Sequence, residues 1–112
     1  MGLKAETEAF PKIQARLGTV DKNNRKVVSV FKLKIRQNGA VVKTMILDLV
    51  DLKFYEGDVD ADCTMIIDDQ DLCDIVNKKA DSSELLKQGK FQVEGKVELL
   101  KQLKEALSGD LQ

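Results

Sequence analysis

The stretch VFKLKIRQNGAVVKTMILDL, from Val30 to Leu49, decides the fold of this chain. Apolar and basic side chains alternate through its first half, which is typical of a strand with one face buried and the other in water. Asn38-Gly39 then supplies the dipeptide that best tolerates the positive φ angles of a type I′ turn. The stretch therefore predicts an antiparallel hairpin of two strands, at residues 27–37 and 40–49.

Shorter patterns on either side of the hairpin predict the remaining elements. Runs of apolar and β-branched residues predict three more strands, at 52–55, 63–67 and 90–93. Apolar residues at helical spacing predict helices at 9–17, 69–77, 81–88 and 97–107. Helices that gather on one face of a mainly antiparallel sheet make an α+β fold. We therefore expect one α+β domain over residues 1–112, with a five-stranded, mainly antiparallel sheet covered by helices.

The charges of the chain argue against a nucleic-acid partner. Lys+Arg 18 against Asp+Glu 19 leaves a net charge of −1, so no overall field attracts an anionic polymer. The basic row Lys32, Lys34 and Arg36 is interpreted as the solvated face of the first strand, since antiparallel sheets commonly turn one polar face to water. No nucleic acid is expected among the partners.

Two segments resemble ligand loops but fail at the positions that set the geometry. In GKFQVEGKV, residues 89–97, five residues separate the glycines and a valine follows the lysine, whereas a phosphate loop needs four residues and a hydroxyl. The acidic segment 58–69 opens like a calcium loop, but Cys63 replaces the glycine of the sharp turn and Asp69 replaces the bidentate glutamate. No metal and no cofactor is predicted.

The chain lacks the residue types of a usual catalytic site. It contains no histidine, which removes the commonest general base and metal ligand. Its serines therefore lack the usual base that activates a nucleophile. Cys63 and Cys73 fall in apolar or helical patterns and are interpreted as buried, reduced thiols. No catalytic residue is predicted, and we expect that the protein is not an enzyme.

The last predicted helix carries a leucine stripe whose purpose the residues leave open. Apolar side chains recur along it at helical spacing, at Val97, Leu100, Leu103 and Leu107. Such a face fits a filled core, which is the commoner case, and it also fits the wall of a cavity for an apolar ligand. Periodicity alone does not separate these two alternatives.

Three longer segments resemble the sterol carrier protein-2 family. DADCTMIIDDQDL, residues 60–72, is similar to the family's passage from an alternating strand into an acidic helix cap. QGKFQVEGKVELLKQL, residues 88–103, resembles the closing passage, in which a Q-G-K turn and a short strand lead through a glycine into the last helix. The hairpin at 30–49 resembles the family's first two strands. The three segments follow the family's order over nearly the whole chain, and short insect forms are the most similar members.

The resemblance implies an apolar tunnel for fatty acids, fatty acyl-CoA or sterols, with the last helix as its lid. The tunnel wall is then expected to consist of inward-facing apolar residues, namely Ile13, Leu17, Phe31, Leu33, Leu47, Leu49, Ile75, Leu100, Leu103 and Leu107. A fatty-acid carboxylate needs donors near the surface, because an unpaired buried ion is costly. The residues Arg16, Asp21, Arg25 and Lys26, around the turn after the first helix, fit an ordinary exposed basic cluster and a carboxylate site equally well. The resemblance favours the carboxylate site, with Asp21 orienting an arginine.

The expected function is that of a non-enzymatic carrier of a long-chain fatty acid, with sterol as a second candidate ligand. The N-terminus lacks a secretory segment, no run is long enough to span a bilayer, and the end GDLQ is no peroxisomal signal, which together favour the cytoplasm. Transient membrane contact and a monomer or weak dimer are compatible with this function. The alternative is an interaction or regulatory module that retains the fold with a filled core and no ligand.

Overall fold

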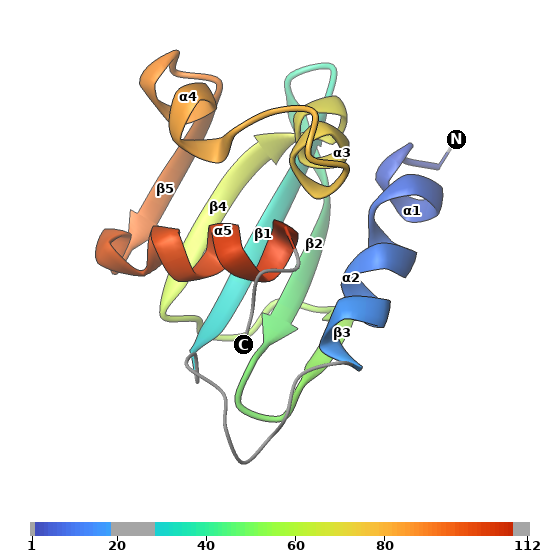
Figure 1. Ribbon diagram of the computed structural model, residues 1–112, viewed down its shortest axis with the longest axis vertical. Helices are drawn as coiled ribbons and strands as arrows, with labels where there is room; N and C mark the ends of the chain where they lie inside the picture. Colours follow the sequence, from blue (N-terminus) through green and yellow to red (C-terminus); the bar gives the residue numbers. More distant parts are fainter. Residues whose placement is uncertain (1, 19–28, 109–112) are drawn as a thin grey trace.

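The computed structural model describes residues 2–18 and 29–108, the side chains of 105–108 excepted (Figure 1). In chain order the elements are α1 (Ala5–Glu8), α2 (Phe10–Leu17), β1 (Val30–Gln37), β2 (Ala40–Asp48), β3 (Lys53–Glu56), β4 (Cys63–Asp68), α3 (Asp69–Val76), α4 (Ser82–Lys87), β5 (Phe91–Gly95), the 3₁₀ turn η1 (Val97–Leu99) and α5 (Leu100–Ser108). The five predicted strands and four predicted helices are confirmed, and the fold is α+β as expected.

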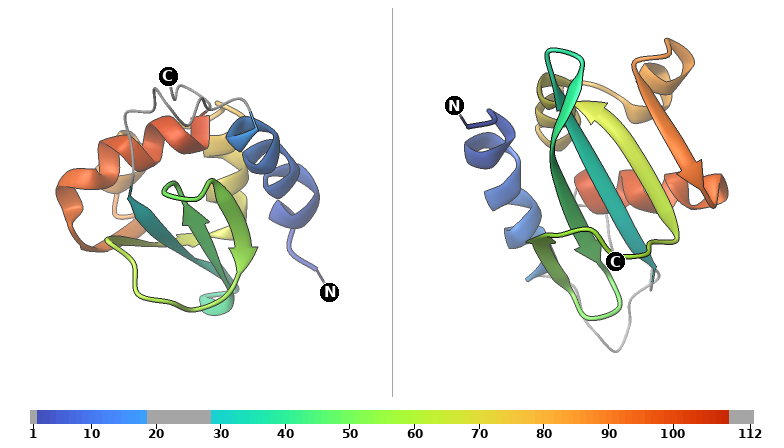
Figure 2. Two further views of the ribbon diagram at one scale, coloured as in Figure 1. Left: turned by 90° about the horizontal axis from the view of Figure 1, so that it is seen from below. Right: turned by 180° about the vertical axis from the view of Figure 1, so that it is seen from behind.

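The five strands form one mixed sheet in the order β3-β2-β1-β4-β5. β1 and β4 run parallel, and the other neighbouring strands are antiparallel. The mainly antiparallel sheet is therefore confirmed. The parallel pair requires the segment 57–62 to cross the sheet, and Figure 2 shows it crossing the face opposite the helices. An ion pair between Lys32 Nζ and Asp58 Oδ1, 2.6 Å apart, holds this crossing against β1.

The central hairpin has the predicted turn and one irregularity that was not predicted. Asn38 and Gly39 have φ angles of 56° and 84°, as a type I′ turn requires. The predicted inward face of β1 is fully buried at Phe31, Leu33 and Ile35. The β1–β2 register shifts after Ile35, so Val42 has no residue opposite it and is exposed. The alternating pattern gives no sign of this bulge.

The described helices all cover one face of the sheet (Figure 2, left). α5 runs across β4, β1 and β2, and it contacts both α3 and α2 (Figure 1). The face of the sheet under these helices carries the buried side chains of the strands. The apolar interior therefore lies between one sheet and one layer of helices.

The N-terminal helix α1 was not predicted, and a side chain from α3 holds it in place. The Asp69 carboxylate accepts hydrogen bonds from the backbone N–H groups of Lys4 and Ala5, at 2.7 and 2.8 Å. Asp69 is the first residue of α3, so its carboxylate joins the start of that helix to α1. Asp68 occupies the N-cap position of α3 without a side-chain capping bond, and its carboxylate accepts from Arg36 Nε at 2.9 Å.

The last helix begins later than the predicted residue 97. Gly95 has a φ of 85°, and a Cβ there would lie 2.9 Å from the carbonyl oxygen of Asp62, so only glycine fits. After this sharp change of direction the chain forms η1, and α5 starts only at Leu100. The prediction that Val97 belongs to the inward stripe is wrong, because Val97 precedes the α-helix and is 58% exposed.

Candidate functional site

The predicted tunnel residues lie together between the sheet and the helices. Nearly all of them are buried members of one apolar cluster, namely Ile13, Leu17, Phe31, Leu33, Leu47, Leu49, Ile75 and Leu103. Leu100 is partly buried against the same cluster. The side chain of Leu107 lies outside the described residues. The structure thus brings residues from α2, β1, β2, α3 and α5 into one volume, while their role as a tunnel wall stays a prediction.

The same cluster contains residues that the sequence patterns did not assign to the site. They are Leu3, Ala5, Ala9, Ile35, Met45, Phe54, Cys63, Met65, Ile67, Leu72, Cys73, Val76 and Phe91. Those on β4 repeat with the period of two that marks one face of a strand, so this signal was available. The N-terminal members carry no such signal, because their burial depends on the contact of α1 with Asp69.

Several cations lie around the C-terminal end of α3, beside buried members of the apolar cluster. Arg16 Nη2, on the last turn of α2, donates a hydrogen bond to the Val76 carbonyl oxygen at 2.9 Å. The Lys12 ammonium donates to the side-chain oxygen of Asn77. Lys78 follows with a left-handed φ of 61°. Cations at this position complement the negative end of the helix dipole, and they place positive charge beside an apolar interior.

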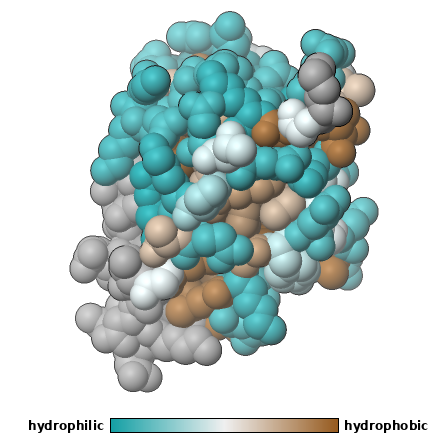
Figure 3. Space-filling view, turned by 90° about the vertical axis from the view of Figure 1, so that its right-hand side faces the viewer, coloured by the Kyte–Doolittle hydropathy of each residue, from teal (hydrophilic) through white to brown (hydrophobic). Residues whose placement is uncertain are grey.

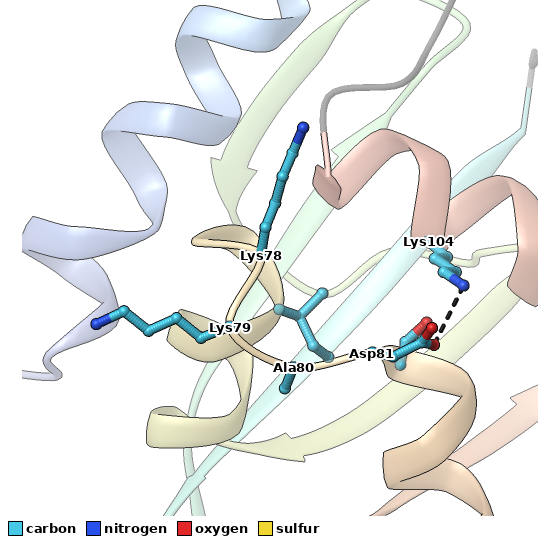
Figure 4. Close-up of a pocket in the computed structure, with 7 residues that line it drawn as sticks. Lys78, Lys79, Ala80, Asp81 and Lys104 are labelled. Carbon is cyan, nitrogen blue, oxygen red and sulfur yellow. Dashed lines mark ion pairs between the residues drawn. The ribbon is translucent and has the colours of Figure 1, made fainter.

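A cavity of about 300 Å³ opens at the turn between α3 and α4. Its wall is formed by Ile75, Lys78, Lys79, Ala80, Asp81, Ser82 and Lys104. In Figure 4 Lys78 and Lys79 extend from the turn in different directions, and Lys104 reaches Asp81 from α5. Because Ile75 belongs to the apolar cluster, this cavity borders the interior on one side and the basic surface on the other.

Asp81 joins α4 to α5 at this cavity. Its carboxylate accepts a hydrogen bond from the Ser83 backbone N–H at 2.7 Å and forms an ion pair with Lys104 Nζ at 3.1 Å. The Ser83 N–H and then the Lys104 ammonium lower the pKa of the Asp81 carboxyl below its usual value. Asp81 is therefore ionised near neutral pH and fastens α5 over the start of α4.

A wider depression lies on another side of the molecule, between α2 and β3. It measures about 620 Å³ and is lined by Gln14, Asp48, Asp51, Leu52, Lys53, Phe54 and Tyr55. The Gln14 side-chain amide donates to the Phe54 carbonyl oxygen at 2.8 Å, which ties α2 to the edge strand. Figure 3 shows hydrophobic atoms gathered in the centre of the side that carries α1, α2 and β3, flanked by hydrophilic ones.

Only one residue of the predicted carboxylate site can be placed. Arg16 lies at the α2–α3 contact described above. Asp21, Arg25 and Lys26 lie in 19–28, outside the described residues. The structure therefore places Arg16 alone, and the carboxylate site stays a prediction.

The two thiols are buried and unpaired, as predicted. Burial raises the pKa of the Cys63 thiol on β4. It also raises the pKa of the Cys73 thiol on α3, to about 11. Thiols with raised pKa values are poor nucleophiles and poor metal ligands near neutral pH. Across 2–18 and 29–104, no three acidic, cysteine or histidine side chains form a group that could hold a metal ion.

Among the described helices, none has both the length and the apolar character needed to cross a bilayer.

Comparison with known proteins gives one family match and several structural neighbours. Residues 10–108 match the family described as the SCP-2 sterol transfer family. No curated protein matched in a sequence search. The chain is similar to the solution structure of sterol carrier protein-2 from Aedes aegypti in complex with palmitate, with 36% identity, a TM-score of 0.85, and coverage of 97% of this chain and 98% of that one.

Two other mosquito structures have the same architecture. Palmitated SCP2L2 from Aedes aegypti is 32% identical, with a TM-score of 0.78 and coverage of 96% of each chain. Sterol carrier protein-2 like-3 from Aedes aegypti is 27% identical, with a TM-score of 0.84 and coverage of 93% of this chain and 96% of that one.

Proposed function

The chain belongs to the SCP-2 sterol transfer family, and from this premise we propose that it is a non-enzymatic carrier that takes up a long-chain fatty acid in its apolar interior. The observation that carries the proposal is the similarity, over 97% of this chain, to a sterol carrier protein-2 in complex with palmitate. A second neighbour is also palmitated. The proposal treats residues 1–112 as one lipid-binding domain.

The apolar cluster supplies the environment that such a ligand needs. Most of its members are aliphatic, and they connect the sheet with α2, α3 and α5. Moving each CH₂ group of a fatty acid from water into such surroundings gains about 0.8 kcal/mol. A sixteen-carbon chain therefore gains on the order of 10 kcal/mol, before the costs of ordering the chain and repacking the interior are subtracted.

The cations at the C-terminal end of α3 supply a place for the carboxylate. Arg16 lies on the rim of the apolar cluster and carries a permanent charge. We propose that Arg16 acts with Arg25 and Lys26, and that Asp21 orients one arginine. A charged head group held at this rim stays close to water while the chain is buried, which avoids the cost of an unpaired ion in the interior.

The proposal assigns no chemistry to the protein. The described thiols are buried with raised pKa values, and the sequence contains no histidine to act as a general base. Uptake and release then follow the partition of the ligand between water, protein and membrane. Sterol as a second ligand, transient membrane contact, a monomer or weak dimer, and a cytoplasmic location remain predictions.

Extraction of the purified protein with organic solvent, followed by mass spectrometry, tests the proposal directly. We expect a long-chain fatty acid in the extract, and displacement of a fluorescent fatty acid by palmitate in solution. Competition by cholesterol in the same assay decides whether sterol shares the site. An empty extract together with no fluorescent fatty-acid binding contradicts the carrier and favours an interaction module with a filled core.

A further inference from the structure

The turn of the β1–β2 hairpin carries an asparagine followed by a glycine, and both are exposed to solvent. Asn38 and Gly39 have φ angles of 56° and 84°, and a Cβ on Gly39 would meet no heavy atom within 4 Å. The Gly39 N–H lies between the closing pair Gln37 and Ala40, and no residue that the structure describes accepts a hydrogen bond from it. An asparagine side chain and the next main-chain nitrogen therefore stand side by side in water, without a side chain to crowd them.

Asn77, the other asparagine within the described residues, has different surroundings. Its side-chain oxygen accepts a hydrogen bond from the Lys12 ammonium. The N–H of the next residue, Lys78, donates to the Ile75 carbonyl oxygen at 3.1 Å. The side chain of Asn77 and the nitrogen after it are thus both held in place, whereas the corresponding groups at Asn38 and Gly39 are not.

The tip of the hairpin can open without the rest of the sheet. β3 pairs with β2 only at residues 45–48, so residues 40–43 are paired with β1 alone. The bulge also leaves Val42 without a residue opposite it. Arg36 is held by its bond to Asp68 at 2.9 Å, so an opening should stop there. Local openings of this kind cost much less free energy than global unfolding.

We propose that Asn38 is a modification site, at which the folded protein converts asparagine to isoaspartate. The Gly39 main-chain nitrogen loses its proton to hydroxide and attacks Asn38 Cγ. The N–Cγ bond forms, the Cγ–Nδ2 bond breaks, and ammonia leaves with a proton from water, which closes a succinimide ring. Water then adds to one of the two ring carbonyls. Opening at the main-chain carbonyl carbon gives isoaspartate, and opening at Cγ gives aspartate, so the whole reaction consumes one water and releases one ammonia.

The opening of the tip is a required step of this reaction. The succinimide ring contains the Cα–C bond of Asn38, so its closure requires a rotation of ψ that a closed type I′ turn does not permit. The reaction should therefore be slower in the folded chain than in the unfolded one. It should still be faster at Asn38 than at Asn77, where two hydrogen bonds must break as well.

The isoaspartyl product changes the hairpin and leaves the interior intact. The main chain then passes through Cβ and Cγ of residue 38, which adds one methylene group to a turn that fits two residues. Because the turn type and loop length fix the register of a hairpin, the pairs Gln37–Ala40 and Arg36–Val41 should be lost. Residues 36–41 contribute nothing to the apolar cluster, so this inference does not depend on the carrier function.

The experiment ages the 1–112 chain and a blocked variant in mildly alkaline buffer without denaturant, followed by trypsin digestion and mass spectrometry. Asn38→Gly is the blocked variant, because Gly-Gly also suits a type I′ turn and has no side-chain amide. Trypsin places Asn38 and Asn77 in the peptides 37–43 and 54–78, so both are measured in one sample. We expect the conversion of amide to acid to be roughly tenfold faster, or more, in the first peptide. Labelling by an isoaspartyl methyltransferase then identifies isoaspartate in that peptide.

The Tm of the aged protein should fall by roughly 4 °C, while the aged Asn38→Gly variant keeps its Tm. The rate at Asn38 should rise with pH, because the attacking nitrogen must lose its proton. Equal rates in the two peptides, or isoaspartate at residue 38 only after unfolding in urea, would overturn the proposal. A loss of Tm of the same size in aged Asn38→Gly would assign the damage to another residue and also contradict it. Each of these outcomes is the same whether or not the protein binds palmitate.

Discussion

The guanidinium Nη2 of Arg16 lies 2.9 Å from the carbonyl oxygen of Val76, so the last turn of α2 is bonded to the last turn of α3. Val76 is fully buried in the apolar cluster, and Arg16 is half-buried at its rim. One contact therefore joins two helices over the interior and fixes a permanent charge beside it. This position gives Arg16 a structural role besides the proposed role in binding.

Replacing Arg16 by alanine should lower the free energy of unfolding by about 1–2 kcal/mol, because the Val76 carbonyl loses a charged donor. Lys12→Ala is the control, since Lys12 bonds the side chain of Asn77 in an exposed position and should cost less than about 0.5 kcal/mol. Urea denaturation of both variants measures the difference. Equal losses would show that the bond between α2 and α3 adds no stability of its own.

Arg25→Ala tests the carboxylate site without disturbing the bond between α2 and α3. We expect palmitate binding to weaken by roughly 1.5–3 kcal/mol, the usual range for a hydrogen bond between charged groups. An uncharged sterol should bind with unchanged affinity. Lys34→Ala, on the sheet face opposite the helices, serves as the control for a general loss of positive charge. Equal effects on palmitate and sterol would place the carboxylate elsewhere.

Leu103 distinguishes a hollow interior from a filled one. It is completely buried, and it anchors α5 to the cluster. In a hollow interior Leu103→Trp should occupy ligand space, so palmitate affinity falls at least tenfold while stability falls by less than about 1.5 kcal/mol. Leu103→Ala should instead retain palmitate binding and lower the free energy of unfolding by about 2–5 kcal/mol. Calorimetry and denaturation decide between them, and normal palmitate binding by the tryptophan variant would rule out a tunnel at this position.

Two glycines allow the cost of a positive φ angle to be separated from the cost of a collision. Gly39 and Gly95 have φ angles of 84° and 85°, but only Gly95 has a backbone oxygen 2.9 Å from the position of a Cβ. Gly39→Ala should therefore cost about 1–2 kcal/mol, the usual penalty of the left-handed conformation. Gly95→Ala should cost about 1–3 kcal/mol more, because β5 must move away from Asp62. Similar losses in urea denaturation would contradict the close approach.

The Cys73 thiol should make stability fall as the solution becomes alkaline. Its folded-state pKa is about 11 against 9.0 for the unperturbed group, so the folded state holds the proton more tightly. The stabilising contribution is complete below about pH 9 and is lost as the pH rises toward 11. Cys73→Ala should show a shallower decline over this range in denaturation measured at several pH values. At pH 8 neither thiol of the native protein should react rapidly with a thiol reagent.

Local chemistry predicted the elements of this fold, and contacts distant in sequence decided the rest. The alternation at Phe31 and Leu33 and the Asn38-Gly39 turn are local, so they identified the hairpin correctly. The parallel pairing of β1 with β4 joins segments about thirty residues apart, such as Phe31 and Cys63, and no local pattern encodes it. The burial of Ala5 and Ala9 depends in the same way on a carboxylate from α3.

Local patterns likewise predicted one part of the candidate site and not the other. Its apolar members followed from strand and helix periodicity, which is why residues such as Ile13 and Leu47 proved to share one cluster. The contacts and burial of the polar residues near them could not be predicted from periodicity. Ser82 looks in the sequence like an ordinary residue in the first turn of a helix, and no local pattern predicts that its side chain is buried. The hydrogen bond from Arg16 to a carbonyl oxygen on another helix is likewise not predicted by any local sequence pattern.

The parallel pairing of β1 with β4 also sets an order for the folding reaction. β1 and β2 are joined by a two-residue turn, so they can pair quickly and alone. β4 pairs with β1, and bringing the two strands together closes a long loop that carries the crossing held by Lys32 and Asp58, so this pairing should be slower. β5 pairs with β4 and α5 packs against α2 and α3, so we expect both to follow. Amide protection after refolding should therefore appear first in β1 and β2, and the helix over the interior should close last.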